Sequence, residues 1–208
     1  MTYEMYFLHG LGQTPSDWID TVKNLDENFD VSCPDLFEWL DGTEFCYANL
    51  YQGLKKLLCQ FDEPFALCGL SLGGILALQY AIEHSDKVKS LILIGTQSSM
   101  PKNLLKFQNM VFRFLPNTVF RKMGASKKDI ISLCNSMIAL DFTDNLKDIH
   151  CRTLILCGKK DKANYSASVQ LKEKITTSEF LVVANAGHEI NKDNPNKLGE
   201  IINTFLLQ

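Results

Sequence analysis

Phe65-Ala66-Leu67-Cys68 is an apolar run that leads directly into the turn Gly69-Leu70-Ser71-Leu72-Gly73-Gly74. Apolar residues then recur at helical spacing, at Ile75, Leu78 and Ile82. The glycines two positions before and after Ser71 allow a sharp turn, because a side chain at either position would be crowded. A strand, a G-x-S-x-G turn and a helix in this order predict that the Ser71 hydroxyl stands exposed at a helix N-terminus, as a candidate nucleophile. The alternative is a glycine-rich entry into a helix with no chemistry.

The rest of the chain repeats this order, a short apolar strand followed by a longer helical pattern. Such alternation is typical of an α/β fold. We expect a three-layer sandwich with a mostly parallel sheet of about six strands, covered by helices on both faces. The expected strands are Tyr3–Leu8, Asp30–Cys33, Phe65–Leu70, Val88–Ile94, Thr153–Cys157 and Glu179–Ala184. The expected helices begin at Thr14-Pro15 and then cover Glu44–Gln60, Ser71–His84, Ser166–Ile175 and Asn194–Leu207.

One segment interrupts this alternation. The strand expected to end at Ile94 and the one expected to start at Thr153 are separated by far more residues than an ordinary connection between a strand and a helix. We interpret Ser99–Ile149 as a helical cap inserted within a single domain that covers residues 1–208. Two sets of apolar residues at helical spacing support this interpretation: Leu104, Phe107, Val111 and Phe114, then Ile130, Leu133, Met137 and Leu140.

Composition excludes several classes of protein. The chain has 208 residues, of which 46% are hydrophobic and 22% charged, as in an ordinary globular domain. A net charge of −3 gives no reason to expect nucleic-acid binding, and no apolar run is long enough to predict stable membrane insertion. The N-terminus lacks the pattern of a signal peptide, and the seven cysteines are scattered singly. We therefore expect a cytoplasmic protein with reduced thiols and no metal site.

A serine nucleophile needs a base that accepts its proton near neutral pH, which points to histidine. His188 follows the last expected strand, and the carboxyl ends of parallel strands are where an open α/β sheet places its chemistry. Asp161 follows the strand before it and completes the order Ser, Asp, His, so we predict that Asp161 orients His188. Two rival carboxylates exist, Asp35 and Glu189. The other histidines at 84 and 150 are predicted to be structural.

Acyl transfer also needs donors aimed at the carbonyl oxygen as it gains negative charge. The backbone N–H of Leu72, directly after the candidate nucleophile, is one predicted donor. The other comes from the loop His9-Gly10-Leu11-Gly12 after the first strand, and we assign it to the N–H of Leu11. His9 and Gly10 are predicted to line the substrate site, with His9 shaping the loop. The alternative for this loop is a plain tight turn.

These segments resemble the α/β-hydrolase superfamily over nearly the whole chain. Residues 7–12 are similar to its oxyanion loop, residues 68–74 to its nucleophile elbow, residues 154–161 to its acid strand and residues 186–188 to its histidine loop. The resemblance implies the Ser71–His188–Asp161 triad and the two oxyanion donors, with no cofactor, and is greatest to small carboxylesterase-like and thioesterase-like members. The chain begins at the third of the family's eight strands. The loop at 33–37 lacks the G-x-G-x-S that often follows it in the family.

We therefore predict a serine hydrolase that cleaves a small carboxylic ester or thioester through an acyl-enzyme on Ser71. One alternative is a ligand-binding or signalling module of the same fold with slow or vestigial catalysis, and another is a lyase or perhydrolase that uses the same triad. Residues 87–128 contain no acidic residue. A basic cap could favour anionic substrates such as a coenzyme A thioester, or brief contact with anionic lipid, and the alternative is a solvated helix face. The oligomeric state is not predicted.

Overall fold

A computed structural model describes residues 3–100, 112, 114–121 and 124–208 of the 208-residue chain. Its centre is a six-stranded sheet with the strand order β2-β1-β3-β4-β5-β6, in which every neighbouring pair is parallel. This confirms the prediction of an α/β fold whose sheet has six strands. The strands are β1 (Tyr3–Leu8), β2 (Phe29–Ser32), β3 (Phe65–Leu70), β4 (Val88–Ile94), β5 (Arg152–Gly158) and β6 (Ser178–Val183).

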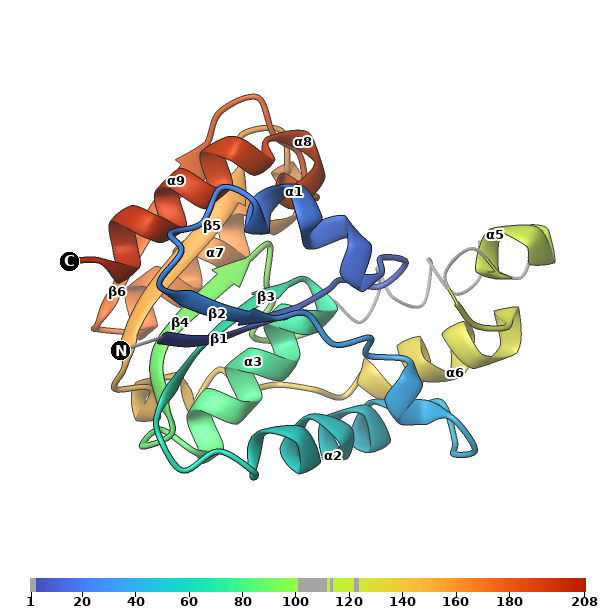
Figure 1. Cartoon of the computed structure of the whole chain (residues 1–208). Coiled ribbons are helices and arrows are strands. Elements are labelled where there is room, and N and C mark those ends of the chain that lie inside the picture. Colours follow the sequence, from blue (N-terminus) through green and yellow to red (C-terminus); the bar gives the residue numbers. More distant parts are fainter. Residues whose placement is uncertain (1–2, 101–111, 113, 122–123) are drawn as a thin grey trace.

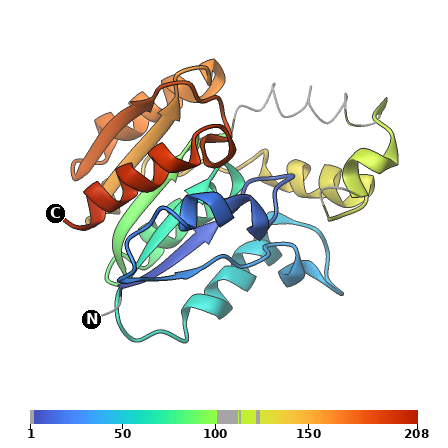
Figure 2. The same cartoon turned by 45° about the horizontal axis from the view of Figure 1, so that its top comes forward.

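Helices cover both faces of the sheet (Figure 1). The longer helices are α2 (Tyr47–Leu58), α3 (Leu72–Glu83), α6 (Lys127–Met137), α7 (Lys162–Lys174) and α9 (Pro195–Leu206). The shorter helices are α1 (Ile19–Val22), α5 (Asn117–Arg121) and α8 (Ile190–Asp193), with 3₁₀ turns η1 (Pro15–Trp18), η2 (Glu38–Leu40) and η3 (Leu146–Asp148). Figure 2 shows α1 and α9 together over one face of the sheet, while α2 and α3 lie on the other.

The side chains on the two faces of the sheet belong to two separate hydrophobic clusters, because successive side chains of a strand point in opposite directions. In β1, Met5 and Phe7 pack under α1, α8 and α9, whereas Tyr6 and Leu8 pack against α2 and α3. Every residue of β3 is buried, from Phe65 to Leu70. A strand buried on both sides needs the continuous apolar run from which the fold was predicted.

The predicted cap lies partly outside the described residues, as do Leu104, Phe107 and Val111, which were assigned to its first helical face. Phe114 is described and is 84% exposed. The second face is formed by α6, whose buried residues are Ile130, Leu133, Cys134 and Met137. Helices α5 and α6 extend beyond the sheet at the right of Figure 1.

The structure corrects two helix starts. Helix α2, expected over Glu44–Gln60, covers Tyr47–Leu58. Helix α7 was expected to start at Ser166 but starts at Lys162, because the side chain of Asp161 accepts a hydrogen bond from the backbone N–H of Asn164 and so caps the helix there. In the described parts of the chain, no helix is long and apolar enough to cross a membrane.

Candidate active site

Ser71 lies at the turn between β3 and α3 in a strained backbone conformation, with φ 52° and ψ −111°. A positive φ costs a residue with a side chain free energy, so such conformations occur where the surrounding structure enforces them. Here the Ser71 N–H donates to the carbonyl of Ile94 at 2.9 Å, which ties the turn to the end of β4. A Cβ at Gly69 would collide with the backbone of Gly73, so this turn requires glycine.

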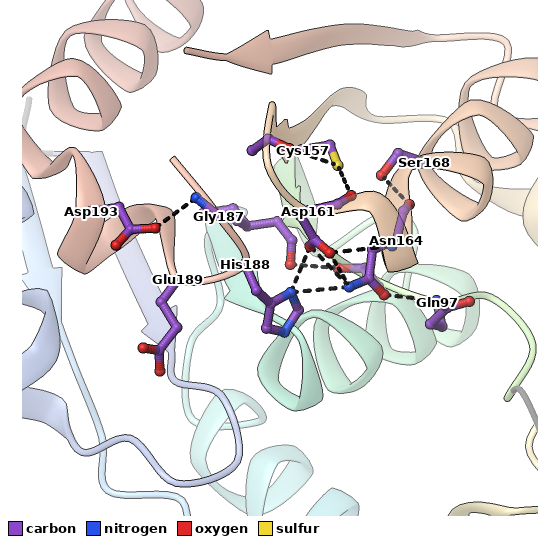
Figure 3. A network of polar contacts seen from close by, with 12 residues as sticks. Gln97, Cys157, Asp161, Asn164, Ser168, Gly187, His188, Glu189 and Asp193 are labelled. Atoms are coloured by element: carbon purple, nitrogen blue, oxygen red, sulfur yellow. Dashed lines mark hydrogen bonds and ion pairs between the residues drawn. The ribbon is translucent and has the colours of Figure 1, made fainter. Parts of the chain in front are cut away.

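His188 and Asp161 form a direct pair. Nδ1 of His188 is 2.8 Å from Oδ2 of Asp161, and the two side chains are 38% and 5% exposed (Figure 3). Asp161 follows β5 and His188 follows β6, and the two loops are joined because Lys160 N–H donates to the carbonyl of Ala186 at 2.9 Å. The carboxylate therefore holds one nitrogen of the imidazole and leaves Nε2 available to accept a proton.

Gly95 connects this pair to the turn of Ser71. It directly follows Ile94, and a Cβ built on it would lie 2.8 Å from both Cε1 and Nδ1 of His188. The imidazole thus packs against the end of the same strand that binds the backbone of Ser71. No hydrogen bond joins the Ser71 hydroxyl to His188 among the described residues. Catalytic hydrogen bonds of this kind are commonly long before substrate binds.

The amide side chain of Asn164 contacts the carboxylate and that of Gln97 contacts Asn164, and the sequence did not indicate either. Nδ2 of Asn164 lies 2.9 Å from each oxygen of Asp161 and 3.1 Å from Nδ1 of His188. Oδ1 of Asn164 accepts a hydrogen bond from Nε2 of Gln97 at 2.7 Å. In the sequence, the only indication of a contact between Asn164 and Asp161 was that Asn164 lies three residues after Asp161, which could cap a helix.

The predicted oxyanion loop lies against the nucleophile turn. A Cβ built on Gly10 would lie 2.7 Å from Cδ2 of Leu70 and 3.6 Å from Cβ of Ser71, so the loop backbone approaches closely. Leu72 is the first residue of α3, and its N–H has no partner within the helix. The Gly10 N–H is directed instead at Oε1 of Gln13, 3.4 Å away. This arrangement is compatible with the assignment of the donors to Leu11 and Leu72.

His9 is fully buried, and both of its ring nitrogens contact backbone groups. Nδ1 donates to the carbonyl of Gly10 at 3.0 Å, and Nε2 accepts from the N–H of Leu36 at 3.1 Å. One donating and one accepting nitrogen describe a neutral imidazole. These contacts join the loop after β1 to the backbone at Leu36, while the assignment of His9 and Gly10 to the substrate site stays a prediction.

The rival carboxylates have other partners. Glu189 accepts a hydrogen bond from Nε2 of Gln13 at 3.1 Å and lies 3.3 Å from Nζ of Lys192, and in Figure 3 its side chain points away from the imidazole of His188. Asp35 lies 3.6 Å from Nε2 of His9.

The remaining histidines, His84 and His150, lie elsewhere. His84 is at the C-terminal end of α3, where its ring packs on Tyr80, and His150 is exposed just before β5. In the described ranges, no group of three or more His, Cys, Asp and Glu side chains could hold a metal ion.

Two ionisable groups near the site have raised pKa values. Burial and the charge of Asp161 raise the pKa of the Cys157 thiol. Cys157 therefore stays neutral, and its Sγ lies 3.5 Å from the backbone carbonyl of Asp161. Glu189 raises the pKa of Lys192, which also lies 3.7 Å from Asp17.

A cleft of about 1380 Å³ opens beside the predicted oxyanion loop, and neither Ser71 nor His188 is among the residues that line it. Gln13 and Thr14 line it on the loop side, and Phe37 and Phe45 contribute aromatic walls. Charged residues of both signs line it: Asp35, Glu38 and Asp41 before α2, and Arg121, Lys127, Lys128 and Asp129 in α5 and α6. The cleft therefore offers apolar surface with charges of both signs.

The sequence matches the family model described as the alpha/beta hydrolase fold over residues 4–146. Since this match covers more than half of the 208 residues, the chain belongs to the α/β-hydrolase fold family. Solved structures agree on the fold. MenH from S. aureus superimposes with a TM-score of 0.84 at 19% identity, covering 100% of this chain and 94% of the other. The enol-lactonase from Burkholderia xenovorans LB400 gives 0.81 at 18% identity, with 100% and 92% covered.

Curated relatives share 23% and 27% of their aligned residues with this chain. The monoacylglycerol lipase abhd6-B of Xenopus laevis is 23% identical over 249 aligned residues, covering 96% of this chain and 74% of the relative. The pimeloyl-[acyl-carrier protein] methyl ester esterase of Aliivibrio fischeri is 27% identical over 93 residues, covering 45% of this chain and 36% of the relative. Both names describe hydrolases of ester bonds, which agrees with the predicted class of enzyme.

Proposed function

We propose that this protein hydrolyses a small carboxylic ester or thioester through an acyl-enzyme on Ser71. The observation that carries the proposal is the 2.8 Å pair of His188 and Asp161, which packs through Gly95 against the strand that binds the strained turn of Ser71. Membership of the α/β-hydrolase fold family and the ester-cleaving relatives support the same class of reaction.

In the proposed reaction, the Ser71 oxygen attacks the carbonyl carbon of the substrate while Nε2 of His188 accepts the hydroxyl proton. The carbonyl oxygen becomes an oxyanion that the N–H groups of Leu11 and Leu72 stabilise. The tetrahedral intermediate collapses as His188 donates that proton to the departing alcohol or thiol, which leaves an ester on Ser71. Water, deprotonated by His188, then releases the acid by the same steps.

The cleft beside the oxyanion loop is the proposed substrate site. Its aromatic walls at Phe37 and Phe45 suit an acyl or alkyl chain, and its rim of mixed charge suits a polar end group. Monoacylglycerols and the pimeloyl-[acyl-carrier protein] methyl ester, the substrates in the relatives' names, both combine an acyl chain with a polar group. We expect the enzyme to act in the cytoplasm, and no cofactor enters the proposed reaction.

The proposal is tested with the variant Ser71→Ala. Hydrolysis of p-nitrophenyl acetate should fall by about 10³-fold or more, because the acyl-enzyme cannot form. A fluorophosphonate probe should add one label to the wild-type protein by intact mass and none to the variant, while the circular dichroism spectrum stays the same. Undiminished turnover by the variant, or a label on another residue, would contradict the proposal. A wild-type protein that takes no label would instead favour a binding module.

A further inference from the structure

Asn164 is the polar side chain that contacts both members of the His188–Asp161 pair. Its Nδ2 lies 2.9 Å from Oδ1 and 2.9 Å from Oδ2 of Asp161, and 3.1 Å from Nδ1 of His188 (Figure 3). An amide nitrogen carries two hydrogens. Each can therefore be donated to one carboxylate oxygen, so that the amide bridges the carboxylate edge that faces it.

The position of the proton on His188 follows from this arrangement. Asp161 Oδ2 accepts from Nδ1 of His188 at 2.8 Å, so Nδ1 carries a hydrogen and Nε2 is left as the acceptor. With Nδ1 protonated, the amide of Asn164 cannot donate to it, and both of its hydrogens go to Asp161. If Nδ1 lost its hydrogen, its lone pair would face the carboxylate at the same distance, which is repulsive. The amide and the imidazole therefore act together as donors to one carboxylate.

Gln97 fixes which way round the amide of Asn164 lies. Nε2 of Gln97 donates to Oδ1 of Asn164 at 2.7 Å, from the loop that follows β4. If the amide were turned over, its oxygen would lie 2.9 Å from both carboxylate oxygens of Asp161, and its nitrogen would face the donor of Gln97. The turned amide could accept only from Nδ1–H of His188, and would lose its contacts with both oxygens of Asp161 and with Gln97, so these partners determine its orientation.

We propose that Asn164 is a positioning residue of the candidate triad, which holds the carboxylate of Asp161 in the plane of the imidazole and so selects the tautomer of His188 with a free Nε2. Gln97 holds Asn164 in turn. This inference rests on the proposed function, since the free Nε2 matters only if it takes the proton of Ser71. It extends the site by one amide from the first turn of α7 and one from the β4 loop, neither of which contacts the reacting atoms.

Two ionisable side chains near the His188–Asp161 pair, Cys157 and Glu189, bear on how a pH profile is interpreted. Cys157 faces the backbone of Asp161 from β5 and stays neutral because burial raises its pKa. Glu189 follows His188 in the chain, but its carboxylate is bound by Gln13 and Lys192. A change in the charge that His188 experiences should therefore come from Asp161 and from whatever residue stands at position 164.

The kinetic test compares Asn164→Leu, which keeps the shape without the donors, with Asn164→Asp, which adds a carboxylate. We expect Asn164→Leu to lower kcat on p-nitrophenyl acetate by about 10–100-fold with little change in KM, because the base is misplaced rather than the substrate. Asn164→Asp should move the acidic limb of the kcat/KM profile to higher pH, since a second negative charge favours the protonated imidazole. The matched control is Ser168→Ala, which removes a hydroxyl that donates to the backbone carbonyl of Asn164 at 3.0 Å and also lies beside the Cys157 thiol, and which leaves the Asn164 amide in place.

A second measurement does not depend on turnover. In the Ser71→Ala background, nitrogen-15 NMR of the His188 ring should show Nδ1 protonated and Nε2 bare. Adding Asn164→Leu should give a mixture of tautomers, and Gln97→Met should give a smaller shift in the same direction. If the ester is not cleaved but the tautomer responds in this way, the proposed function fails and the positioning role stands.

The inference is overturned if Asn164→Leu keeps the wild-type kcat, pH profile and His188 tautomer. It is equally overturned if Ser168→Ala changes them as much as Asn164→Leu does. Should Asn164→Leu fail to fold by circular dichroism, Gln97→Met decides in the same two assays, because Gln97 lies outside α7. An unchanged tautomer in Gln97→Met would then count against the proposal.

Discussion

Gly95 shows how the absence of a side chain can position a candidate catalytic residue. Its φ is +55°, and a Cβ there would lie 2.8 Å from two ring atoms of His188 and 3.4 Å from Oδ2 of Asp161. We predict that Gly95→Ala lowers kcat/KM for ester hydrolysis by about 100-fold, because the imidazole must move away from Ser71. Steady-state kinetics with p-nitrophenyl acetate measures this loss.

The left-handed backbone at Gly95 would also lower the free energy of unfolding by about 1–2 kcal/mol for any residue with a Cβ. Gly42→Ala is the matched control, because Gly42 has a φ of +69° but nothing within 4 Å of the position of a Cβ. Both variants should lose similar stability in a denaturant titration, and only Gly95→Ala should lose activity. Equal activity in the two variants would show that His188 tolerates the added methyl group.

At the scale of single residues, the sequence predicts which residues follow the strands. Ser71, Asp161 and His188 each follow a strand of a parallel sheet, and the carboxyl ends of parallel strands meet at one edge. The contact of Asp161 with His188 could therefore be anticipated, although Glu189 lies nearer to the histidine in the chain. Asn164 could not be anticipated, because its contact depends on where α7 begins.

At the scale of the elements, two buried amides join the predicted oxyanion loop to the loop that carries His188. Gln13 lies after the loop of β1, and Asn191 lies in α8, directly after the loop that carries His188. Each amide donates to the other at 3.2 Å, and Gln13 also accepts from the N–H of Gly10 at 3.4 Å. The two halves of the proposed site are thus connected by a pair that is nearly inaccessible to water, with exposures of 2% and 1%.

We predict that Asn191→Leu lowers the free energy of unfolding by about 1–3 kcal/mol, because it leaves the Gln13 amide buried with fewer partners. Gln13→Met should lower the free energy of unfolding by a similar amount in the wild-type protein, and by less when Asn191→Leu is already present. A double-mutant cycle in urea gives the coupling free energy of the pair. Strictly additive losses would mean that the two amides do not depend on each other.

The early start of α7 and the contact with His188 both depend on the side chain of Asp161. The pattern of apolar residues placed the helix at Ser166, since the first turn carries Lys162, Ala163 and Asn164, which give no amphipathic signal. The cap is the carboxylate of Asp161, the same carboxylate that contacts His188. One side chain therefore serves both the helix and the histidine, and a pattern of single residues does not show such a double role. The four-residue helix α8 was missed because it is too short for periodicity to appear.

At the scale of the whole molecule, the sheet could be predicted because each strand is an apolar run and each crossover a helical pattern. The order of the strands in space, β2-β1-β3-β4-β5-β6, was not predicted, because parallel strands joined by helical crossovers can be arranged in more than one order. The cleft could not be predicted, because its walls come from the segments before α2 and from α5 and α6, which contact each other only in the folded chain. Substrate choice, which should depend on that cleft, is for the same reason the least predictable property of the molecule.

The buried thiols connect the hydrophobic core to the pH dependence of stability. Cys134 in α6 is 2% exposed, and burial raises the pKa of its thiol to about 11, whereas in the unfolded chain it ionises at about 8.5–9. Between these values the unfolded state binds fewer protons than the folded state, so stability falls as the pH rises. From pH 8.5 to 10.5, wild type should therefore lose about 1–2 kcal/mol more free energy of unfolding than Cys134→Ala, measured by urea titration under reducing conditions. Cys59→Ala, which removes an exposed thiol, should follow the wild-type curve, and parallel curves for Cys134→Ala and wild type would refute this account of the core.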